Sequence, residues 1–265
     1  MKIGFIGAGN MASAIINGII SSGVMPSNEI YVSDVNPMAC EKLARKGVCV
    51  MQSNRALART VDCVVLAIKP VYADGVVTEV YDELCEKFVI SIIGSWSHET
   101  LQAALPESAR FVRVMPNTPL AVGEGMSLIG QTYTCTQEEL DFTRTIFSAA
   151  GKVRIIEDHA FTAASGISGC GPAFVYQFIE ALADGGVRYG VPRAAAYELA
   201  AQTLIGAAKM VLETGEHPGR LKDAVCSPGG TTIEGIFALE EGGMRAAVIH
   251  AVGATVEKTN RMSQK

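Results

Sequence analysis

Two short stretches of this 265-residue chain combine glycine with small residues in a way that suits the binding of anions. The first is Ile3-Gly-Phe-Ile-Gly-Ala-Gly-Asn-Met-Ala12, which places a GxGxxA pattern between an expected strand and an expected helix. In that pattern Gly7 permits a tight turn, Gly9 lets the backbone approach a pyrophosphate, and Ala12 lets helix and strand pack closely. The amino end of the helix then faces the negative charge. The stretch predicts dinucleotide binding, with a merely structural turn as the alternative.

An acidic residue ends the second expected strand, at the distance from the glycines that a dinucleotide site requires. This strand ends Tyr31-Val-Ser-Asp34. A carboxylate there can bind the ribose hydroxyls of NAD and repel the 2′-phosphate of NADP. No arginine stands at Val35 or Asn36, and Arg55 is the nearest candidate for binding such a phosphate. These residues alone lean toward NADH.

The second stretch is Ser227-Pro-Gly-Gly-Thr-Thr232, which opens another expected helix. Pro-Gly-Gly makes a tight loop, and Thr231 with Glu234 predicts a capping box on the helix behind it. The loop is then expected to aim the backbone N–H groups of Gly230, Thr231 and Thr232 at one point, which suits a carboxylate. From this stretch alone, an ordinary helix cap after a glycine-rich turn is an equal alternative.

The elements that must position these residues alternate between strand and helix in the first part of the chain, which is typical of a parallel α/β sheet. Helix starts are predicted at Asn36-Pro37, at Ser97 and at the capping box Thr136-Gln-Glu-Glu139. The expected strands are Lys2–Gly7, Glu29–Ser33, Asp62–Ile68, Phe88–Ile93, Arg110–Met115, Met126–Ile129 and Lys152–Ile156.

After about Asp158 the strand patterns end and helical patterns follow. The expected helices are Phe174–Ala183, Pro192–Glu213, Thr232–Glu240 and Met244–Asn260. Within Tyr197–Leu212 apolar and small residues cover most of the helix circumference, so this helix must be buried nearly all round. The second half is too short to bury several such helices by itself, and we expect it to form an intimate dimer. The predicted domains are residues 1–158 and 159–265.

Composition excludes several classes of protein. Hydrophobic residues make up 49% of the chain and charged residues 18%, which excludes a disordered chain. The net charge is −5 and the lysines and arginines are scattered, which argues against nucleic acid or an anionic membrane as the main partner. The four histidines show no metal-binding spacing, so no metal is expected.

Cysteine usage and hydropathy predict a soluble, cytoplasmic protein. The seven cysteines are widely spaced and form no CxxC pair, so neither a disulfide framework nor a zinc site is expected. Ala160–Ile179 carries no charge over the length of a membrane span. Its glycines, serines, proline and glutamine instead indicate a glycine-rich turn that runs into a buried helix of a soluble protein.

The sequence closely resembles the pyrroline-5-carboxylate reductases, and the resemblance covers essentially the whole chain. It is carried by Phe5–Ala12, Ala67-Ile-Lys-Pro70, Met115-Pro-Asn-Thr-Pro119, Gly166–Ala173, Ala183–Val187 and the segment from His217-Pro to Thr232. The resemblance implies an N-terminal Rossmann-type doubly wound sheet followed by an all-α dimerisation domain. It also implies the last step of proline biosynthesis, in which NAD(P)H reduces L-1-pyrroline-5-carboxylate to L-proline.

The same resemblance implies roles for individual residues. Thr232 is expected to bind the ring nitrogen as the catalytic residue, and the substrate carboxylate is expected at Ser227, Gly230, Thr231 and Thr232. NADPH is the expected cofactor, with NADH allowed by Asp34. A homodimer through the C-terminal helices is expected, with a higher oligomer of dimers left open. The cofactor residues are expected to be Ile6, Gly7, Ala8, Gly9, Asn10, Met11, Ser33, Asp34, Asn54, Ala67, Ile68, Lys69, Pro70 and Gly94.

Two other functions compete with this interpretation. A related two-domain NAD(P)H-dependent imine or oxo-acid reductase is one, although a β-hydroxyacid dehydrogenase would need a lysine on Phe174–Ala183, which has none. A non-catalytic NAD(P)-binding dimer is the other, and it leaves the loop after Ser227 without a purpose. Among the remaining polar residues, Asp184 is expected to pair with Arg188, while Trp96 and the histidines are expected to be structural or at the surface.

Overall fold

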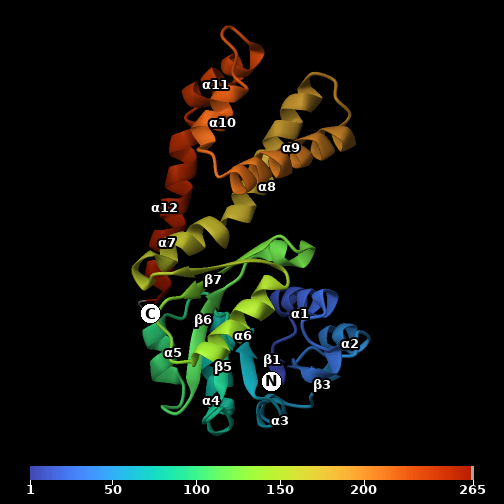
Figure 1. The fold of residues 1–265 in the computed structure, drawn as a ribbon, viewed down its shortest axis with the longest axis vertical. Helices are drawn as coiled ribbons and strands as arrows, with labels where there is room; N and C mark the ends of the chain where they lie inside the picture. Colours follow the sequence, from blue (N-terminus) through green and yellow to red (C-terminus); the bar gives the residue numbers. More distant parts are fainter. Residues whose placement is uncertain (264–265) are drawn as a thin grey trace. The chain divides into compact units, whose positions relative to one another are not determined.

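The computed structural model describes residues 1–263, and within them eight strands form one sheet in the order β3-β2-β1-β4-β5-β6-β7-β8 (Figure 1). Strands β1 to β6 are parallel, and the strand order reverses between β1 and β4. Such a reversal opens a crevice at the carboxyl ends of these two strands. The expected Rossmann-type sheet is confirmed. The strands are β1 (Ile3–Ile6), β2 (Ile30–Ser33), β3 (Cys49–Val50), β4 (Cys63–Leu66), β5 (Phe88–Ser91), β6 (Arg110–Met115), β7 (Gly125–Gly130) and β8 (Gly151–Ile156).

Strand β7 departs from the expected parallel sheet, because it runs antiparallel to β6. Between Met115 and Gly125 the chain forms only the short 3₁₀ helix η3 (Thr118–Val122). A parallel crossover needs a dozen or more residues, so this short connection forces the chain to turn back. A full helix then follows β7, and β8 pairs with it in parallel as expected.

The helices begin where local capping predicts. The Asn36 side chain accepts a hydrogen bond from the Met38 backbone, and Thr136 forms the full capping box with Glu139. The helices of the sheet-containing part are α1 (Asn10–Ser22), α2 (Pro37–Ala44), α3 (Asn54–Thr60), α4 (Pro70–Glu79), α5 (His98–Ala104), α6 (Gln137–Ser148) and α7 (Asp158–Ser168), with 3₁₀ helices η1 (Ser27–Glu29) and η2 (Asp82–Leu84). The sequence patterns did not predict α3, α4, α7 or the short strand β3.

Helices cover both faces of the sheet, so its central strands are buried on both sides. In β4, Cys63 and Val65 belong to the core that α1, α2 and α6 complete, whereas Val64 and Leu66 belong to the core under α3, α4 and α5. This alternation follows from the two-residue period of a strand. It explains why the strand reads as a continuous apolar run in the sequence.

By its contacts the chain divides into two compact units, residues 1–170 with the chain from Thr255 onward, and residues 171–254. Helix α7 packs on β7 and β8 and therefore belongs to the first unit. There the Arg113 guanidinium lies 4.0 Å from the centre of the Phe161 ring. Burial lowers the pKa of Arg113 to about 10, so it remains a cation at neutral pH. The domain boundary at residue 158 stays a prediction.

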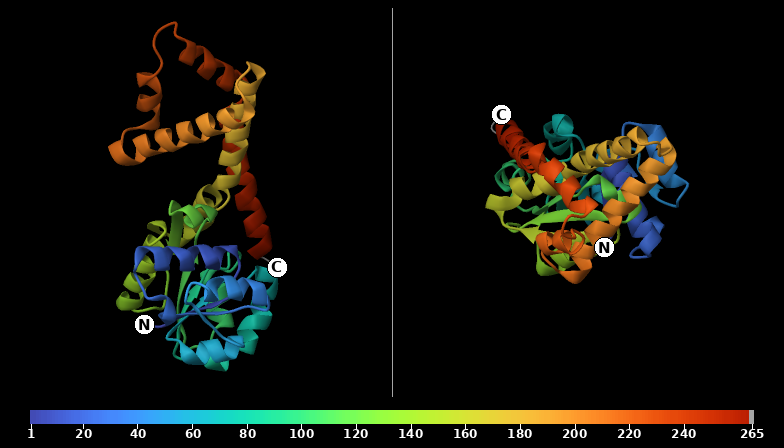
Figure 2. Two further views of the ribbon diagram at one scale, coloured as in Figure 1. Left: turned by 90° about the vertical axis from the view of Figure 1, so that its right-hand side faces the viewer. Right: turned by 90° about the horizontal axis from the view of Figure 1, so that it is seen from above.

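The second unit consists of helices, of which α8 and α9 contact each other through small residues (gold to orange in Figure 2). Ala183, Ala196 and Ala200 are buried between them. No helix within residues 1–263 is both long and apolar enough to cross a bilayer, and the uncharged stretch from Ala160 is divided between α7 and α8. The helices here are α8 (Gly171–Arg188), α9 (Arg193–Thr214), α10 (Pro218–Ala224), α11 (Thr231–Glu241) and the first part of α12 (Met244–Ser263), which continues from Thr255 into the first unit.

Large apolar side chains of the second unit remain exposed within a single chain. Within one chain the helix over Tyr197–Leu212 is not buried nearly all round, because Leu199 and Leu212 are each 61% exposed and Met210 is 51% exposed, and its burial in a dimer stays a prediction. The stretch expected to be a buried helix after Gly171 likewise buries only Ala183 fully in α8. An isolated unit with such surfaces needs a partner to cover them.

Candidate functional site

The glycine-rich turn connects β1 to α1 at the crevice where the strand order reverses. Gly7 has a φ of +105°, and a Cβ atom there would lie 2.4 Å from the Ala67 carbonyl oxygen. The Gly7 N–H donates to the Ser33 carbonyl oxygen at 2.8 Å. Both the backbone conformation and the neighbouring strand end therefore require glycine at this position.

Gly9 differs from Gly7, because the fold itself gives no reason for a glycine there. It is the N-cap of α1 with an ordinary φ of −68°, and a Cβ atom would meet nothing within 4 Å. Ala12, one turn later, is 1% exposed and lies in the core. A pyrophosphate can bind in open space over the amino end of a helix, and here the helix has 13 residues. The residues present thus fit a dinucleotide.

The Asp34 carboxylate lies directly beside this turn. One of its oxygens accepts the Ala8 N–H at 2.6 Å and the other accepts the Asn36 N–H at 2.8 Å. The carboxylate is therefore held in place by the backbone, and each oxygen keeps a lone pair for a further donor. Its neighbour Ser33 is 2% exposed and donates its hydroxyl proton to Asn54 Oδ1 at 2.8 Å. Four of the predicted cofactor residues, Ala8, Ser33, Asp34 and Asn54, thus lie together at the end of β2.

The remaining predicted cofactor residues follow the ends of the neighbouring strands. Ala67 to Pro70 follow β4, with exposed Lys69 as the N-cap and Pro70 as the first residue of α4. Gly94 follows β5. Strands β2, β1, β4 and β5 are adjacent in the sheet, so the topology brings all of these residues to one edge. The edge at the carboxyl ends of the strands is where α/β folds of this type bind dinucleotides.

Met115 is a residue of this edge to which the sequence motif gave no role. Its methyl carbon lies 3.5 Å from the place where a Cβ atom on Gly94 would stand, and 3.1 Å from the corresponding place on Gly169. Just after it, Asn117 is 8% exposed and accepts the Met126 N–H while donating to the Ser168 carbonyl oxygen. These contacts fix the end of β6 against the end of α7, which the spacing within the motif alone could not indicate.

The loop predicted to bind a carboxylate lies in the second unit. Gly229 has a φ of +66° and therefore favours glycine, whereas a Cβ atom on Gly230 would lie 2.4 Å from the Ser227 hydroxyl oxygen and would displace that side chain. Thr231 and Thr232 are the first two residues of α11, and both are exposed. Their N–H groups have no carbonyl partner within their own helix. They remain available to an anion.

Two details of this loop correct the sequence interpretation. The capping box of Thr231 with Glu234 is wrong, because α11 begins at Thr231 and its N-cap is Gly230, which has no side chain. The Gly230 N–H is not available either, since it donates to the Ser227 carbonyl oxygen at 3.0 Å. The loop therefore offers two helix-end N–H groups and two threonine hydroxyls, where three N–H groups were expected.

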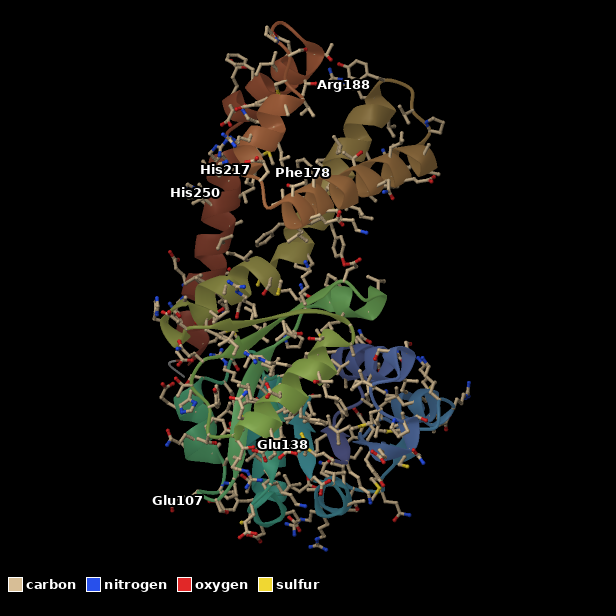
Figure 3. The ribbon with its side chains drawn as sticks, in the orientation of Figure 1. Glu107, Glu138, Phe178, Arg188, His217 and His250 are labelled. Carbon is tan, nitrogen blue, oxygen red and sulfur yellow. The ribbon has the colours of Figure 1, made fainter. Side chains whose placement is uncertain are left out.

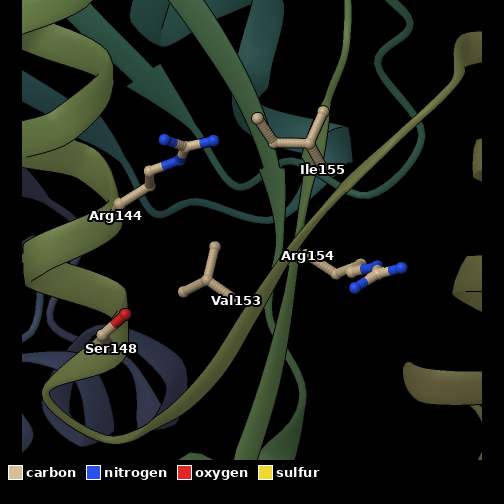
Figure 4. Close-up of a pocket in the computed structure, with 5 residues that line it drawn as sticks. All are labelled: Arg144, Ser148, Val153, Arg154 and Ile155. Carbon is tan, nitrogen blue, oxygen red and sulfur yellow. The ribbon is translucent and has the colours of Figure 1, made fainter.

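Other polar residues have structural contacts. Asp184 pairs with Arg193 and not with the predicted Arg188. His217 is the N-cap of α10, where its ring accepts the Gly219 N–H at 3.0 Å (His217 is labelled in Figure 3). Trp96 is 6% exposed and belongs to the core under α5. A cavity of about 480 Å³ beside α6 and β8 contains none of the predicted site residues, and Figure 4 shows its two arginines, Arg144 and Arg154, extending in different directions.

Comparison with known proteins matches both halves of the chain. Residues 158–262 match the family model described as pyrroline-5-carboxylate reductase dimerisation, and residues 2–94 match the model described as NADP oxidoreductase, coenzyme F420-dependent. A pyrroline-5-carboxylate reductase of Methanosarcina acetivorans is 44% identical over 100% of this chain and 98% of its own.

Solved structures agree over the same length. A pyrroline-5-carboxylate reductase from Coxiella burnetii superposes with a TM-score of 0.92 at 34% identity, covering 100% of this chain and 99% of the other. The Plasmodium falciparum pyrroline carboxylate reductase with NADP bound gives a TM-score of 0.90 at 33% identity, covering 99% and 98%.

Proposed function

The chain belongs to the pyrroline-5-carboxylate reductase family and reduces L-1-pyrroline-5-carboxylate to L-proline with NAD(P)H, and we propose which of its residues carry this reaction. The open space over Gly9 carries the cofactor part of the proposal. The pyrophosphate lies over the amino end of α1, and the adenosine ribose lies toward Asp34 and Asn54. Ala67 to Pro70 and Gly94 contact the nicotinamide side. When bound, the reduced nicotinamide supplies the hydride.

The loop from Ser227 to Thr232 holds the substrate. The N–H groups of Thr231 and Thr232 bind the carboxylate, helped by the positive end of the α11 dipole. Binding at this end orients the ring and sets the face of the C5=N bond that is presented to the hydride. Positioning of this kind supplies much of the rate enhancement when the substrate is already electrophilic.

Thr232 contacts the ring nitrogen through its hydroxyl. A protonated cyclic imine is an N–H donor, so at the start of the reaction the hydroxyl oxygen accepts this hydrogen bond. Hydride addition at C5 converts the C=N double bond to a single bond, and the proton stays on nitrogen. Because a threonine hydroxyl is a weak acid, its role is to hold the protonated nitrogen and not to provide the proton, which comes from solvent.

The functional molecule is a homodimer formed by the C-terminal helices, in the cytoplasm. A largely apolar cavity of about 570 Å³ in the second unit is lined by Phe178, Ile236, Leu239, Met244, Val248 and Ile249 together with the charged residues Lys222, Glu240 and Arg245 (Phe178 is labelled in Figure 3). Leu239, Val248 and Ile249 are each more than 40% exposed. A second copy of the same helices has the apolar surface to cover this face. The seven cysteines are free thiols, which supports a reducing compartment.

The test of this proposal follows the oxidation of NADPH and NADH at 340 nm, in separate reactions with L-1-pyrroline-5-carboxylate. We expect substrate-dependent oxidation by the natural chain. Thr232→Ala should lower kcat by about tenfold to a hundredfold while the dissociation constant of the dinucleotide stays unchanged, because one hydrogen bond to the reacting group is lost. Thr232→Ser keeps the hydroxyl and should retain most of the activity.

Two results would contradict the proposal. Equal kcat values for Thr232→Ala and the natural chain would remove the role of Thr232. A folded, dinucleotide-binding protein that oxidises neither cofactor with this substrate would favour a related reductase acting on another imine or oxo acid.

A further inference from the structure

Three side chains from three different elements form a continuous chain of hydrogen bonds beside Asp34. Ser33, at the end of β2, donates to Asn54 Oδ1 at 2.8 Å. Asn54, the first residue of α3, donates through Nδ2 to Glu79 Oε2 at 2.9 Å. Glu79 is the last residue of α4 and is half-buried. Ser33 and Asn54 belong to the proposed cofactor site, whereas Glu79 has no role in the reaction as proposed above.

The chemistry of these groups gives the chain of hydrogen bonds a direction. An ionised carboxylate can only accept, so the atom of Asn54 that faces Glu79 must be the amide nitrogen. The amide oxygen then faces Ser33, and the Ser33 hydroxyl must donate its proton to it. Glu79 therefore determines the orientation of the amide and, through it, the position of the serine proton.

This direction decides what the end of β2 offers to a ligand. Ser33 is 2% exposed, and with its proton directed to Asn54 its hydroxyl oxygen can only accept a further hydrogen bond, as the adjacent Asp34 carboxylate does. The nearby arginines interact with Glu83, which pairs with Arg59 at 2.7 Å and lies 3.8 Å from Arg55. A ribose hydroxyl is a donor and matches such a surface, whereas a 2′-phosphate brings negative charge and needs donors.

We propose that Glu79 is a specificity-determining positioning residue, which orients Asn54 and Ser33 so that the adenosine end of the cofactor site favours NADH over NADPH. The proposal rests on the proposed function in one respect, namely that the dinucleotide binds at this edge of the sheet. Glu79 acts through Asn54, because the Asn54 side chain occupies the position between it and Ser33.

Glu79→Gln tests the proposal with little change in shape. A glutamine can donate or accept, so the Asn54 amide can reverse and the Ser33 proton becomes free to bind a phosphate oxygen. We expect the ratio of the dissociation constants of NADPH and NADH to fall by about tenfold to a hundredfold, the worth of one hydrogen bond to a charged group. The measurement is a calorimetric titration with each dinucleotide, without substrate.

Two further variants separate this effect from a loss of charge or of fold. Asp74→Asn removes an exposed carboxylate from the same helix and should leave the ratio unchanged. In a Ser33→Ala background, Glu79→Gln should no longer shift the ratio, because the proton that it releases is absent. A shift in the Asp74 variant equal to that of Glu79→Gln would overturn the proposal, and so would a shift that persists without Ser33.

The titration also separates this inference from the enzymatic activity. A protein that shows the predicted ratios but does not reduce L-1-pyrroline-5-carboxylate would contradict the proposed function alone. A protein that reduces this substrate and whose ratio does not respond to Glu79→Gln would contradict the role of Glu79 alone.

Discussion

Gly7 and Gly9 stand two residues apart in one turn and are glycines for different physical reasons. At Gly7 the positive φ and the Ala67 carbonyl oxygen leave no room for a side chain. At Gly9 the backbone is extended and the surrounding space is open. Gly7 is therefore required by the fold, whereas Gly9 is not, which is why we propose that Gly9 serves a bound dinucleotide.

This difference predicts opposite results for the same substitution. Gly7→Ala should lower the free energy of unfolding by more than about 2 kcal/mol, because a strained φ and a backbone clash combine. Gly9→Ala should change it by less than about 1 kcal/mol but weaken dinucleotide binding by about tenfold or more, since its methyl group projects into this open space. Urea denaturation and dinucleotide titration measure the two effects. Unchanged affinity in Gly9→Ala would place the pyrophosphate elsewhere.

Asp34 provides a second prediction at the scale of one residue. Its carboxylate is fixed by two backbone N–H groups with lone pairs left over. Asp34→Asn should weaken NADH binding by about tenfold, because a hydrogen bond to a charged acceptor becomes neutral, and should improve NADPH binding, because a repulsive charge is removed. The control is Asp62→Asn, whose carboxylate also accepts a backbone N–H, that of Lys2, but lies just before β4. If Asp34→Asn changed the dissociation constants of NADH and NADPH by the same factor, the contact of Asp34 with the ribose would be contradicted.

At the scale of elements, local caps and ion pairs fix how helices meet strands. Glu139 closes the capping box of α6 and also binds Arg110 of β6, with Nε and Nη2 both 2.9 Å from Oε1. Burial alone would raise the pKa of Glu139, but the hydrogen bonds from Arg110 and from the Thr136 backbone outweigh it and hold this pKa below the usual range of a glutamate. One side chain thus anchors the helix to the sheet.

The lowered pKa of Glu139 predicts a dependence of stability on pH. Since the folded-state pKa lies below the unfolded-state value, the stabilisation is present above that value and is lost as the pH falls through the folded-state pKa. At neutral pH, Glu139→Gln should cost about 1 to 3 kcal/mol. The free energies of unfolding of the two proteins should converge in acid, once the pH has fallen through the lowered folded-state pKa of Glu139. Glu138→Gln, at an exposed neighbour labelled in Figure 3, should cost less than about 0.5 kcal/mol. A constant difference at all pH values would exclude this titration.

At the scale of the whole molecule, the two units differ in how they bury their apolar residues. The first unit places strand side chains in two cores, one on each face of its sheet. The second unit fully buries three alanines and leaves Phe237 62% and Ile249 63% exposed. Single-chain burial is therefore sufficient for the sheet and insufficient for the helices, which is the physical reason for expecting a second copy.

Placing one charge on this apolar face should break the dimer. The natural chain is expected to have a mass of about twice 28.0 kDa in solution, and Ile249→Asp should give the mass of a single chain at micromolar concentration. The measurement is light scattering coupled to gel filtration. Met38→Asp adds the same charge at a 70% exposed apolar residue of α2 and should remain dimeric. A dimeric Ile249→Asp would exclude this face as the interface.

The sequence determined the features that depend on neighbours a few residues apart. The glycine turn after β1, the Asn36 cap and the capping box of α6 follow from contacts within one turn, so their residue types suffice to predict them. The resemblance of the whole chain added the family, which is confirmed, and the proposed residues of its site, which stay predictions. In the loop from Ser227 to Thr232 a helix start was predicted correctly, but the N-cap is Gly230 and not the predicted Thr231. The error of one residue arises because two adjacent small residues can both begin a helix.

Only the tertiary structure decided which distant residues meet. Ser33, Asn54 and Glu79 lie far apart in the sequence, and only the packing of α3 between β2 and α4 brings them into one chain of hydrogen bonds. The reversed direction of β7 and the exposed faces of the second unit are likewise set by connection length and by the burial available to the whole chain. Such contacts depend on the path of the backbone through space, and residue types at fixed spacing do not encode that path locally.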